Sequence, residues 1–399
     1  ATAGYSYFEV NGENFGMDNY NFSVDGIKYW DIGQGSYLTD GKAGMSSGKS
    51  VTERLFSFFA RANYSYQDKY MLSASIRHEG SSKFAADNRW ANFWSATAGW
   101  RISNEEFMKD FDWLDDLKIR FGYGVTGNND FSATYMANML GSDTNWMMPN
   151  GTWAYSYGKS QNVNPNLGWE EKKEWNLGVD YSFFEGRLYG KFDYYRREVD
   201  NLLFSVKVPQ PPYTQGSQMQ NIGSMESKGW EFEVGGDIIR TKDFTWSSSM
   251  NLSHNTGKIL TLEGDNSYHN GNGFVAPGTP GDAARMEAGS TIGSFYMWKF
   301  AGFDDEGSFL LYNKDGEVIP AAQKTENDKQ YIGNYTPKLI IGWSHTLTYK
   351  NFDLGINLRS WIDFDVYNTI NMYYGIQGQG NLNVLKDAYG KFNHIKGEK

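Results

Sequence analysis

The sequence has no cysteine among its 399 residues, which excludes disulfide frameworks, cysteine-based zinc sites and thiol nucleophiles. Proline is scarce, at 9 residues, so the chain is neither collagen-like nor a proline-rich linker array. Positive charge is also in deficit, because 37 Lys and Arg residues against 47 Asp and Glu give a net charge of −10. With a pI of about 5.1, this composition argues against a nucleic-acid partner.

The sequence also lacks any apolar run near the ~20 residues that a membrane-spanning helix requires. Its mean hydropathy of −0.61 would be ordinary for a soluble protein. These two facts still allow a transmembrane β-barrel, because half of each barrel strand faces a polar lumen and dilutes the hydropathy. Glycine, with 45 residues, and aromatic residues, at 17%, are abundant instead.

Two-residue alternation is the dominant pattern along the chain. From Leu117 to Tyr123 every odd position is large and apolar, while the even positions hold Lys118, Arg120 and glycine. A strand sorts such residues onto two faces, whereas a helix would scatter them around its circumference. Most segments with this pattern are close to the 9–11 residues of a tilted membrane strand. We predict roughly ten strands, at about 54–66, 70–78, 91–101, 117–124, 173–183, 187–198, 229–239, 243–253, 338–349 and 352–363.

The connections between these strands alternate between short and long. Tight turns are predicted at 66–70, 184–187, 240–243 and 349–352. Long loops rich in Gly, Asn, Ser and Asp are predicted at about 125–168, 203–222, 254–290 and 364–390. Short turns on one side and long loops on the other are typical of outer-membrane barrels. Residues 103–116 are the exception on the short side and have room for a small helix.

Two regions are undecided from the pattern alone. Residues 1–50 show no clear alternation, and the segment from Ile292 to Gly302 resembles a strand only imperfectly. The strand at 243–253 must run away from the short turns, and the strand at 338–349 must run back towards them. Residues 291–337 therefore contribute an even number of membrane strands, which is either zero or two.

Aromatic residues crowd the ends of the strands next to the short turns. They are Tyr64, Tyr66, Tyr70, Phe183, Phe184, Phe244, Tyr349 and Phe352. An interfacial girdle of a membrane barrel needs amphipathic or bulky rings at this depth. The alternative is that these rings cap the core of a soluble β-sandwich. Strand length and loop asymmetry favour the girdle.

Motifs that carry chemistry are missing or incomplete. Residues 44–48 satisfy the G-x-S-x-G pattern, but they lie in a predicted Gly/Ser-rich loop and not between a strand and a helix, so we interpret the match as chance. The five histidines lack the spacing of a metal pair on one element. The acidic turns at 304–307 and 313–316 do not complete a calcium loop. We therefore predict no catalytic residue, no metal ligand and no cofactor.

One loop, at 142–169, is unusually aromatic for a polar segment. It carries Trp146, Trp153, Tyr155, Tyr157 and Trp169 among Asn, Ser and Gly. Flat rings can stack on sugar rings, and neighbouring amides and hydroxyls can bind hydroxyl groups. The first four residues are therefore our candidate ligand-binding residues. The alternative is that the loop folds on itself and buries its rings as a small core.

Ordered short motifs along residues 50 to 370 resemble the C-terminal barrel portion of the SusC/RagA-type TonB-dependent outer-membrane transporters. Each motif is weak alone, but the order is specific. The matching segments are 66–77, 79–84, 88–90, 99–103, 117–120, 127–128, 164–170, 221–225, 228–229, 292–296, 332–334 and 336–338.

The resemblance implies an all-β fold, namely a segment of a 22-stranded antiparallel transmembrane barrel with long extracellular loops and a plugged lumen. It implies nutrient uptake across the cell outer membrane, usually of oligosaccharides and sometimes of peptides. A SusD-like surface lipoprotein would cover the mouth, and TonB–ExbB–ExbD would act through an N-terminal part absent here. We therefore expect residues 1–399 to form one incomplete barrel domain, without plug, TonB-contacting segment or final strands.

Two rivals remain open. One is a secreted soluble β-protein that binds or degrades carbohydrate, and the other is a passive porin-like channel without a plug. The sandwich and the barrel differ in which face is covered. A barrel exposes the odd residues of 117–123 to lipid and lines its lumen with Lys118 and Arg120, whereas a sandwich buries the odd residues between two sheets.

Overall fold

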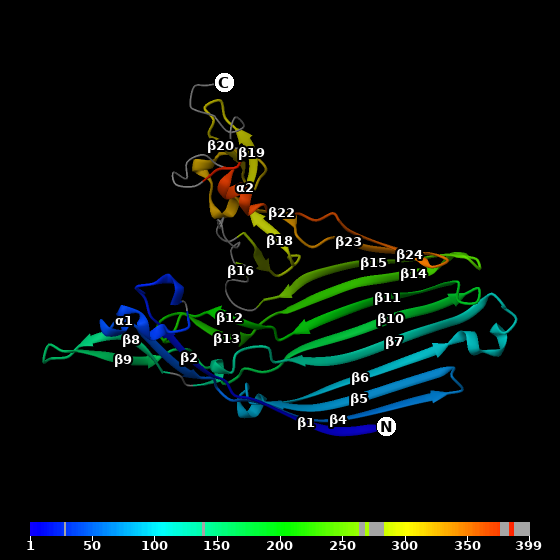
Figure 1. Cartoon of the computed structure of the whole chain (residues 1–399), viewed down its shortest axis with the longest axis horizontal. Coiled ribbons are helices and arrows are strands. Elements are labelled where there is room, and N and C mark those ends of the chain that lie inside the picture. Colours follow the sequence, from blue (N-terminus) through cyan, green and yellow to red (C-terminus); the bar gives the residue numbers. More distant parts are fainter. Residues whose placement is uncertain (28, 138–139, 263–267, 271–282, 376–382, 387–399) are drawn as a thin grey trace.

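The computed structural model describes residues 1–27, 29–137, 140–262, 268–270, 283–375 and 383–386 (Figure 1). One antiparallel sheet of eleven strands dominates it, in the order β1-β4-β5-β6-β7-β10-β11-β14-β15-β23-β24. Its strands are β1 (Thr2–Val10), β4 (Glu53–Tyr66), β5 (Tyr70–Ser81), β6 (Trp90–Arg101), β7 (Leu114–Asn128), β10 (Glu170–Phe183), β11 (Leu188–Asp200), β14 (Ser224–Arg240), β15 (Phe244–Thr261), β23 (Leu339–Tyr349) and β24 (Phe352–Ile362).

All ten predicted strands are present in this sheet, and β1 is an eleventh strand from the undecided region 1–50. Several strands run past their predicted ends on the long-loop side, because backbone pairing continues where the side-chain alternation has already ended. β15 pairs directly with β23. Residues 291–337 therefore add no strand to the main sheet. Of the two numbers of membrane strands that the sequence allowed for this region, zero is correct and two is wrong.

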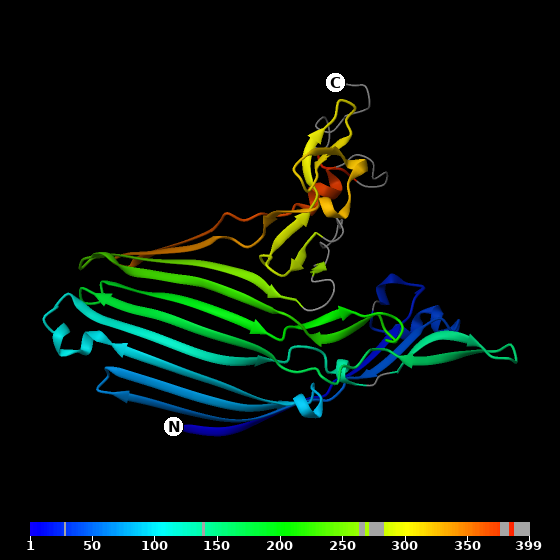
Figure 2. The same ribbon diagram turned by 180° about the vertical axis from the view of Figure 1, so that it is seen from behind.

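Short turns and long loops lie at opposite ends of the sheet, as predicted (Figures 1 and 2). The exceptional short-side segment contains two 3-10 helices, η4 (Ile102–Asn104) and η5 (Glu106–Met108). The 3-10 helices on the long-loop side are η1 (Asp25–Ile27), η2 (Ile32–Gln34), η3 (Ala86–Asn88), η6 (Ala133–Met136), η7 (Ala321–Gln323) and η8 (Glu326–Asp328).

The long-loop segments carry small sheets and two short α-helices. Residues 44–48, expected as a loop, belong instead to a strand that pairs with its neighbour β2. The paired strands are β2 (Glu13–Asp18) with β3 (Gly44–Lys49), β8 (Leu140–Met147) with β9 (Trp153–Lys159), β12 (Leu203–Lys207) with β13 (Ser217–Asn221), β16 (Tyr268–Asn270) with β17 (Arg285–Glu287), and β18 (Ser294–Met297) with β22 (Gln330–Asn334). The remaining elements are β19 (Lys299–Phe303), β20 (Phe309–Tyr312), β21 (Val318–Pro320), α1 (Ser36–Thr39) and α2 (Thr369–Tyr374).

The register sorts the side chains of the main sheet onto an apolar face and a polar face. Along one row of the apolar face, Leu177 pairs with Phe121 on one side and Tyr194 on the other. Along a row of the polar face, Asp180 pairs with Lys118 and Lys191 in the same way. Strand pleating places these two rows on opposite sides, as the alternation predicted.

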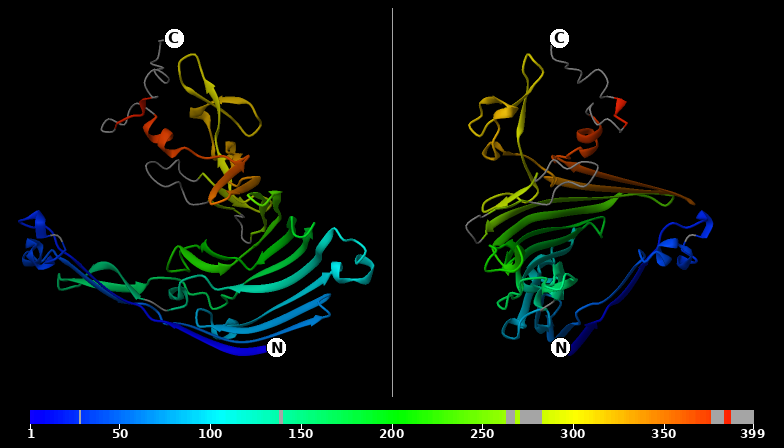
Figure 3. Two further views of the ribbon diagram at one scale, coloured as in Figure 1. Left: turned by 45° about the vertical axis from the view of Figure 1, so that its right-hand side comes forward. Right: turned by 90° about the vertical axis from the view of Figure 1, so that its left-hand side faces the viewer.

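The apolar face is the more exposed of the two, which reverses the arrangement of a soluble sandwich. On β5, Leu72 and Ile76 are 54% and 52% exposed, whereas the intervening Ser73 and Ser75 are less exposed. The sheet is a curved wall, and no second sheet of the described residues covers its apolar side (Figure 3). A sandwich would bury that side, so the structure favours the barrel.

Aromatic residues border the apolar face at both ends. Tyr64, Tyr66, Tyr70 and Phe352 are exposed beside the short turns, as predicted for a girdle. A second row, which the pattern did not reveal, lies towards the long-loop ends; its ring contacts are Phe56–Trp90, Trp94–Tyr123, Trp175–Tyr194 and Trp230–His254. Ion pairs lie just beyond this row, at Arg54–Glu9 and Arg196–Glu226. The apolar band thus ends in rings and then in charges, as in membrane barrels.

Candidate functional site

The predicted ligand-binding residues lie on one projecting hairpin, formed by β8 and β9, at the long-loop end (Figure 1). Trp153 and Tyr157 are four positions apart on β9 and therefore share a face. Trp146 pairs with Ala154, which places it on the opposite face. The exposed fractions of Trp146, Trp153 and Tyr157 are 66%, 65% and 69%. Tyr155 pairs with Asn145 through its backbone, and its side chain lies outside the described residues.

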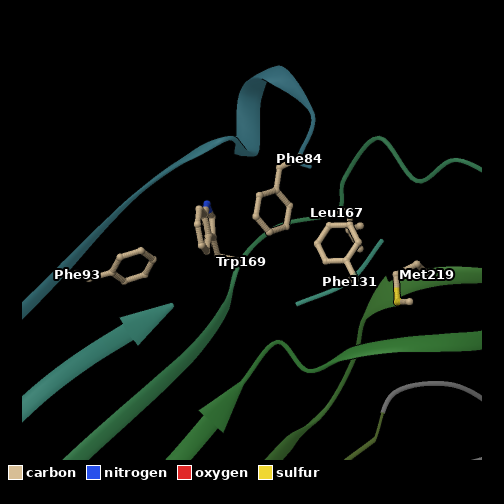
Figure 4. Close-up of a cluster of buried hydrophobic side chains, with 6 residues drawn as sticks. All are labelled: Phe84, Phe93, Phe131, Leu167, Trp169 and Met219. Atoms are coloured by element: carbon tan, nitrogen blue, oxygen red, sulfur yellow. The ribbon is translucent and has the colours of Figure 1, made fainter. Parts of the chain in front are cut away.

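The fifth aromatic residue of this loop, Trp169, has a different role. It packs in a buried cluster at the long-loop ends of β6 and β7, and its indole Nε1 donates a hydrogen bond to the Arg89 carbonyl at 3.0 Å. The cluster consists of Phe84, Phe93, Phe131, Leu167, Trp169 and Met219 (Figure 4). The small-core interpretation therefore holds for Trp169, while the described rings of the hairpin stay exposed.

Amide side chains fix the base of the hairpin to the neighbouring β12–β13 sheet. The Asn162 amide donates to the Gln215 and Ser217 carbonyls at 2.7 and 2.9 Å. The Asn164 amide donates to the Met219 carbonyl at 3.0 Å, and the Asn221 side chain exchanges two hydrogen bonds with the Gly168 backbone. These contacts order the surface from which the hairpin projects.

Sequence reasoning had used Asn164 and Asn221 only as marks of family resemblance, and it had missed Asn162. The available signal was amide residues in loops rich in Gly and Pro. Such residues hydrogen-bond backbone groups that no sheet satisfies.

Titratable groups in the long-loop region have structural partners. Burial, followed by the hydrogen bond from its hydroxyl to Glu287, raises the pKa of Tyr331 to about 12. The Thr325 hydroxyl and backbone N–H donate to Asp328, and these bonds lower the pKa of that carboxyl. The carboxylates of Glu287 and Asp328 thus each accept hydrogen bonds that order the loops, and the two do not form a catalytic pair.

The acidic turns are ordinary hydrogen-bonded turns. Asp304 accepts from the backbone N–H groups of Glu306 and Ser308, and Asn313 accepts from those of Asp315 and Glu317. Among the residues that the structure describes, no three His, Cys, Asp or Glu side chains form a group able to hold a metal ion. In the same residues, none of the helices has the length and apolarity to cross a membrane.

The polar face of the sheet divides into a charged sector and a hydroxyl sector. In the charged sector, Arg120 is bidentate to Asp180, with both nitrogen–oxygen distances 2.8 Å, and reaches Asp193 at 3.1 Å. The hydroxyl sector spans β1, β4, β5 and β6 and also holds an ion pair, between Arg77 and Glu79 at 2.6 Å. Its hydrogen-bonded pairs are Ser6–Ser57, Asn63–Ser73 and Ser75–Ser95.

The family described as TonB dependent receptor-like, beta-barrel, matches residues 2–389 of this chain. The TonB-dependent receptor SusC of Bacteroides thetaiotaomicron is 34% identical over 340 residues, which cover 82% of this chain and 33% of SusC. The TonB-dependent receptor P3 of Formosa agariphila is 31% identical over 415 residues, which cover 98% of this chain and 39% of that receptor.

Solved structures of the RagAB peptide transporter superpose on the chain. One has a TM-score of 0.76 at 26% identity, covering 90% of this chain and 38% of that one. In its closed-closed state the TM-score is 0.77. The chain thus spans between 33% and 39% of the length of these proteins. These comparisons confirm the SusC/RagA-type resemblance, the all-β barrel fold and the outer-membrane location. The 22-strand count, the domain limits and the ligand-binding residues stay predictions.

Proposed function

The chain belongs to the TonB-dependent receptor β-barrel family, and from that premise we propose that the whole protein imports a nutrient across the outer membrane. The exposed apolar face supports this proposal, because Leu72, Phe121 and Leu177 lie on a surface that membrane lipid would cover favourably. The polar face then lines the lumen through which the nutrient passes.

The ligand that the hairpin fits best is an oligosaccharide. The observation that carries this assignment is the exposure of Trp146, Trp153 and Tyr157 on a strand pair fixed to an amide-rich loop. Indole and phenol rings combine an apolar face with a polar edge, which suits sugar rings and their hydroxyl groups. A peptide is the second candidate, because a structure similar to this chain is that of a peptide transporter.

Two partners follow from this function. A SusD-like surface lipoprotein would cover the long-loop mouth and enclose the captured ligand. TonB–ExbB–ExbD would supply energy through a part of the protein outside the 399 residues. Outer-membrane lipid surrounds the apolar face, and no nucleic acid takes part.

Uptake measurements in the native cell test the proposal. A deletion of the gene for the full-length protein is complemented with the parent, and uptake of labelled neutral oligosaccharides and of labelled short peptides is measured with and without TonB. We expect TonB-dependent uptake of an oligosaccharide that is lost in the deletion. Uptake of peptides alone would assign the second candidate, and uptake of either that persists without TonB would refute energised import.

A further inference from the structure

We propose that the outward, apolar face of β10, β11 and β14 binds the phosphate of an outer-leaflet lipid headgroup through Arg196 and Lys228. The inference depends on the outer-membrane location of the chain and is independent of the proposed import function. Arg196 on β11 and Lys228 on β14 lie directly opposite each other in the register. Their side chains are 47% and 53% exposed, at the long-loop border of the apolar band.

The two cations lie one step beyond the aromatic row. The outward residues next to them on the membrane side are Tyr194 and Trp230, which pair with each other. Two residues of a strand span about 7 Å, so the cationic groups reach the depth at which lipid headgroups follow the interfacial rings. Long loops of membrane barrels lie outside the cell, and these headgroups therefore belong to the outer leaflet.

The complete barrel would leave this surface open to lipid. The strands on either side of the three, β7 and β15, are both present in the sheet (Figure 1), so no further strand inserts there. A plug would fill the lumen, which borders the opposite face. The exposure of Arg196 and Lys228 is therefore a property of the barrel wall itself.

The row that contains the two cations carries no acid between β10 and β15. Its members are Trp175, Arg196, Lys228 and Thr256. An arginine can hold a phosphate through two parallel N–H···O bonds, and a lysine adds a compact positive charge. The indole N–H and the hydroxyl are further donors beside them. This set of side chains suits a phosphate group better than a neutral or cationic one.

One carboxylate is shared by both cations. Glu226 Oε2 lies 2.6 Å from a terminal nitrogen of Arg196, and Glu226 Oε1 lies 3.5 Å from Lys228 Nζ. The Glu226 side chain is only 12% exposed and lies one row further from the membrane. Two cations against one carboxylate leave a positive charge unbalanced, and a headgroup that approaches from the lipid side meets the cations first.

The other outward charges of these strands lie further from the membrane and largely cancel. The row beyond the cations holds Lys173, Glu198, Glu226 and Lys258, with two charges of each sign. Asp200, in the following row, pairs with Lys173 at 2.7 Å. Coulomb attraction falls with distance and with salt screening, so a phosphate at the membrane border interacts mainly with the nearest row.

The opposite border of the same strands has a different composition. At the short-turn end, Phe183 pairs with Leu188 on the outward face of β10 and β11. These two side chains offer lipid an apolar surface without charge. The cation pair is therefore particular to the long-loop border, as expected for a site that binds headgroups of one leaflet.

Native mass spectrometry of the full-length protein in detergent tests the site. The probes are diphosphoryl lipid A, its dephosphorylated form and inorganic phosphate. The test variant combines Arg196→Gln with Lys228→Gln. The matched control combines Arg197→Gln with Lys191→Gln, which removes two cations from the polar face of the same sheet; Arg197, for example, contacts Glu174 there at 2.9 Å. Heat-modifiable migration shows that each variant has folded.

We expect the parent to bind diphosphoryl lipid A about tenfold more tightly than the dephosphorylated form, the factor that one charge-assisted hydrogen bond supplies. The Arg196→Gln, Lys228→Gln variant should lose this preference, and the polar-face control should keep it. Glu226→Gln removes the carboxylate that competes with the phosphate, so it should strengthen the preference about two- to fivefold. A misfolded barrel would not produce this gain.

Equal binding of the two lipid forms by the parent, or an unchanged preference in the Arg196→Gln, Lys228→Gln variant, would overturn the proposal. Displacement of the lipid by an equal concentration of inorganic phosphate would also overturn it, because the site would then recognise free phosphate. A changed oligomeric state with unchanged lipid binding would assign the surface to contacts between copies of the chain instead. The experiment measures binding alone, so its outcome is distinct from success or failure of import.

Discussion

Leu177 and Asn176 are neighbours in β10, yet their side chains lie on opposite faces of the sheet. Leu177 pairs with Phe121 and Tyr194 on the apolar face and is 44% exposed. Asn176 pairs with Gly122 and Tyr195 on the polar face. In a barrel, the side chain of Leu177 would therefore face lipid and that of its neighbour Asn176 would face the lumen.

We expect Leu177→Arg to impair barrel assembly far more than Asn176→Arg. An arginine near the midplane on the lipid side costs about 2–4 kcal/mol, whereas lumen substitutions cost less. Heat-modifiable migration of the full-length protein measures assembly in both variants. Equal losses of the folded band would show that the faces are assigned wrongly.

The alternation of apolar residues with polar residues or glycine was sufficient to predict these faces. It failed at β1, where Tyr5 and Tyr7 lie on the apolar face but Phe8 and Val10 are large apolar residues on the opposite face. It also missed β2 and β3, because Gly and Ser positions carry no apolar signal although their backbones pair. The amide contacts of Asn162 depend on loops distant in sequence, so no local pattern reveals them.

The main sheet ends at β1 and β24, and each of these strands pairs on one side only among the described residues. Unpaired backbone groups are costly in lipid, and every residue of β24 is exposed. We therefore expect residues 1–399 expressed alone to aggregate in detergent or to require the rest of the protein. Size-exclusion chromatography with circular dichroism measures this. A stable monomer with high β content would contradict the prediction.

Glu105 connects the short turns of two hairpins. It accepts from the Tyr70 hydroxyl at 2.6 Å and from Trp100 Nε1 at 3.1 Å, and it pairs with Lys69. These hydrogen bonds, the Tyr70 bond foremost, hold the pKa of Glu105 below its usual value of 4.5. A lowered pKa in the folded state means that this stabilisation is complete above pH 4.5 and is lost as pH falls through the folded-state pKa.

Glu105→Gln should therefore be less stable than the parent at pH 7, and the difference should shrink below pH 4.5. Thermal unfolding of the full-length protein in detergent, measured from pH 7 to pH 3, gives both curves. Asp112→Asn removes an exposed carboxylate from the same segment and controls for the change in charge. A difference that stays constant with pH would rule out the Glu105 contacts as its cause.

Alanine variants of the β8–β9 hairpin can test ligand binding sharply, because the aromatic rings of this hairpin lie on two opposite faces. Trp153 and Tyr157 share one face and Trp146 lies on the other. A single bound oligosaccharide would contact one face. We therefore expect the alanine variants to divide into an affected and an unaffected set.

Replacement of a ring that stacks on the ligand by alanine should weaken binding by roughly 1–3 kcal/mol, on the scale known for base–aromatic stacking. The variants are Trp146→Ala, Trp153→Ala, Tyr155→Ala and Tyr157→Ala, with Trp30→Ala as a matched exposed tryptophan on another loop. Calorimetry on the full-length protein measures affinity, and uptake should fail only at low ligand concentration because the barrel still assembles. If all four variants bind and import like the parent, the hairpin is structural and the ligand binds elsewhere.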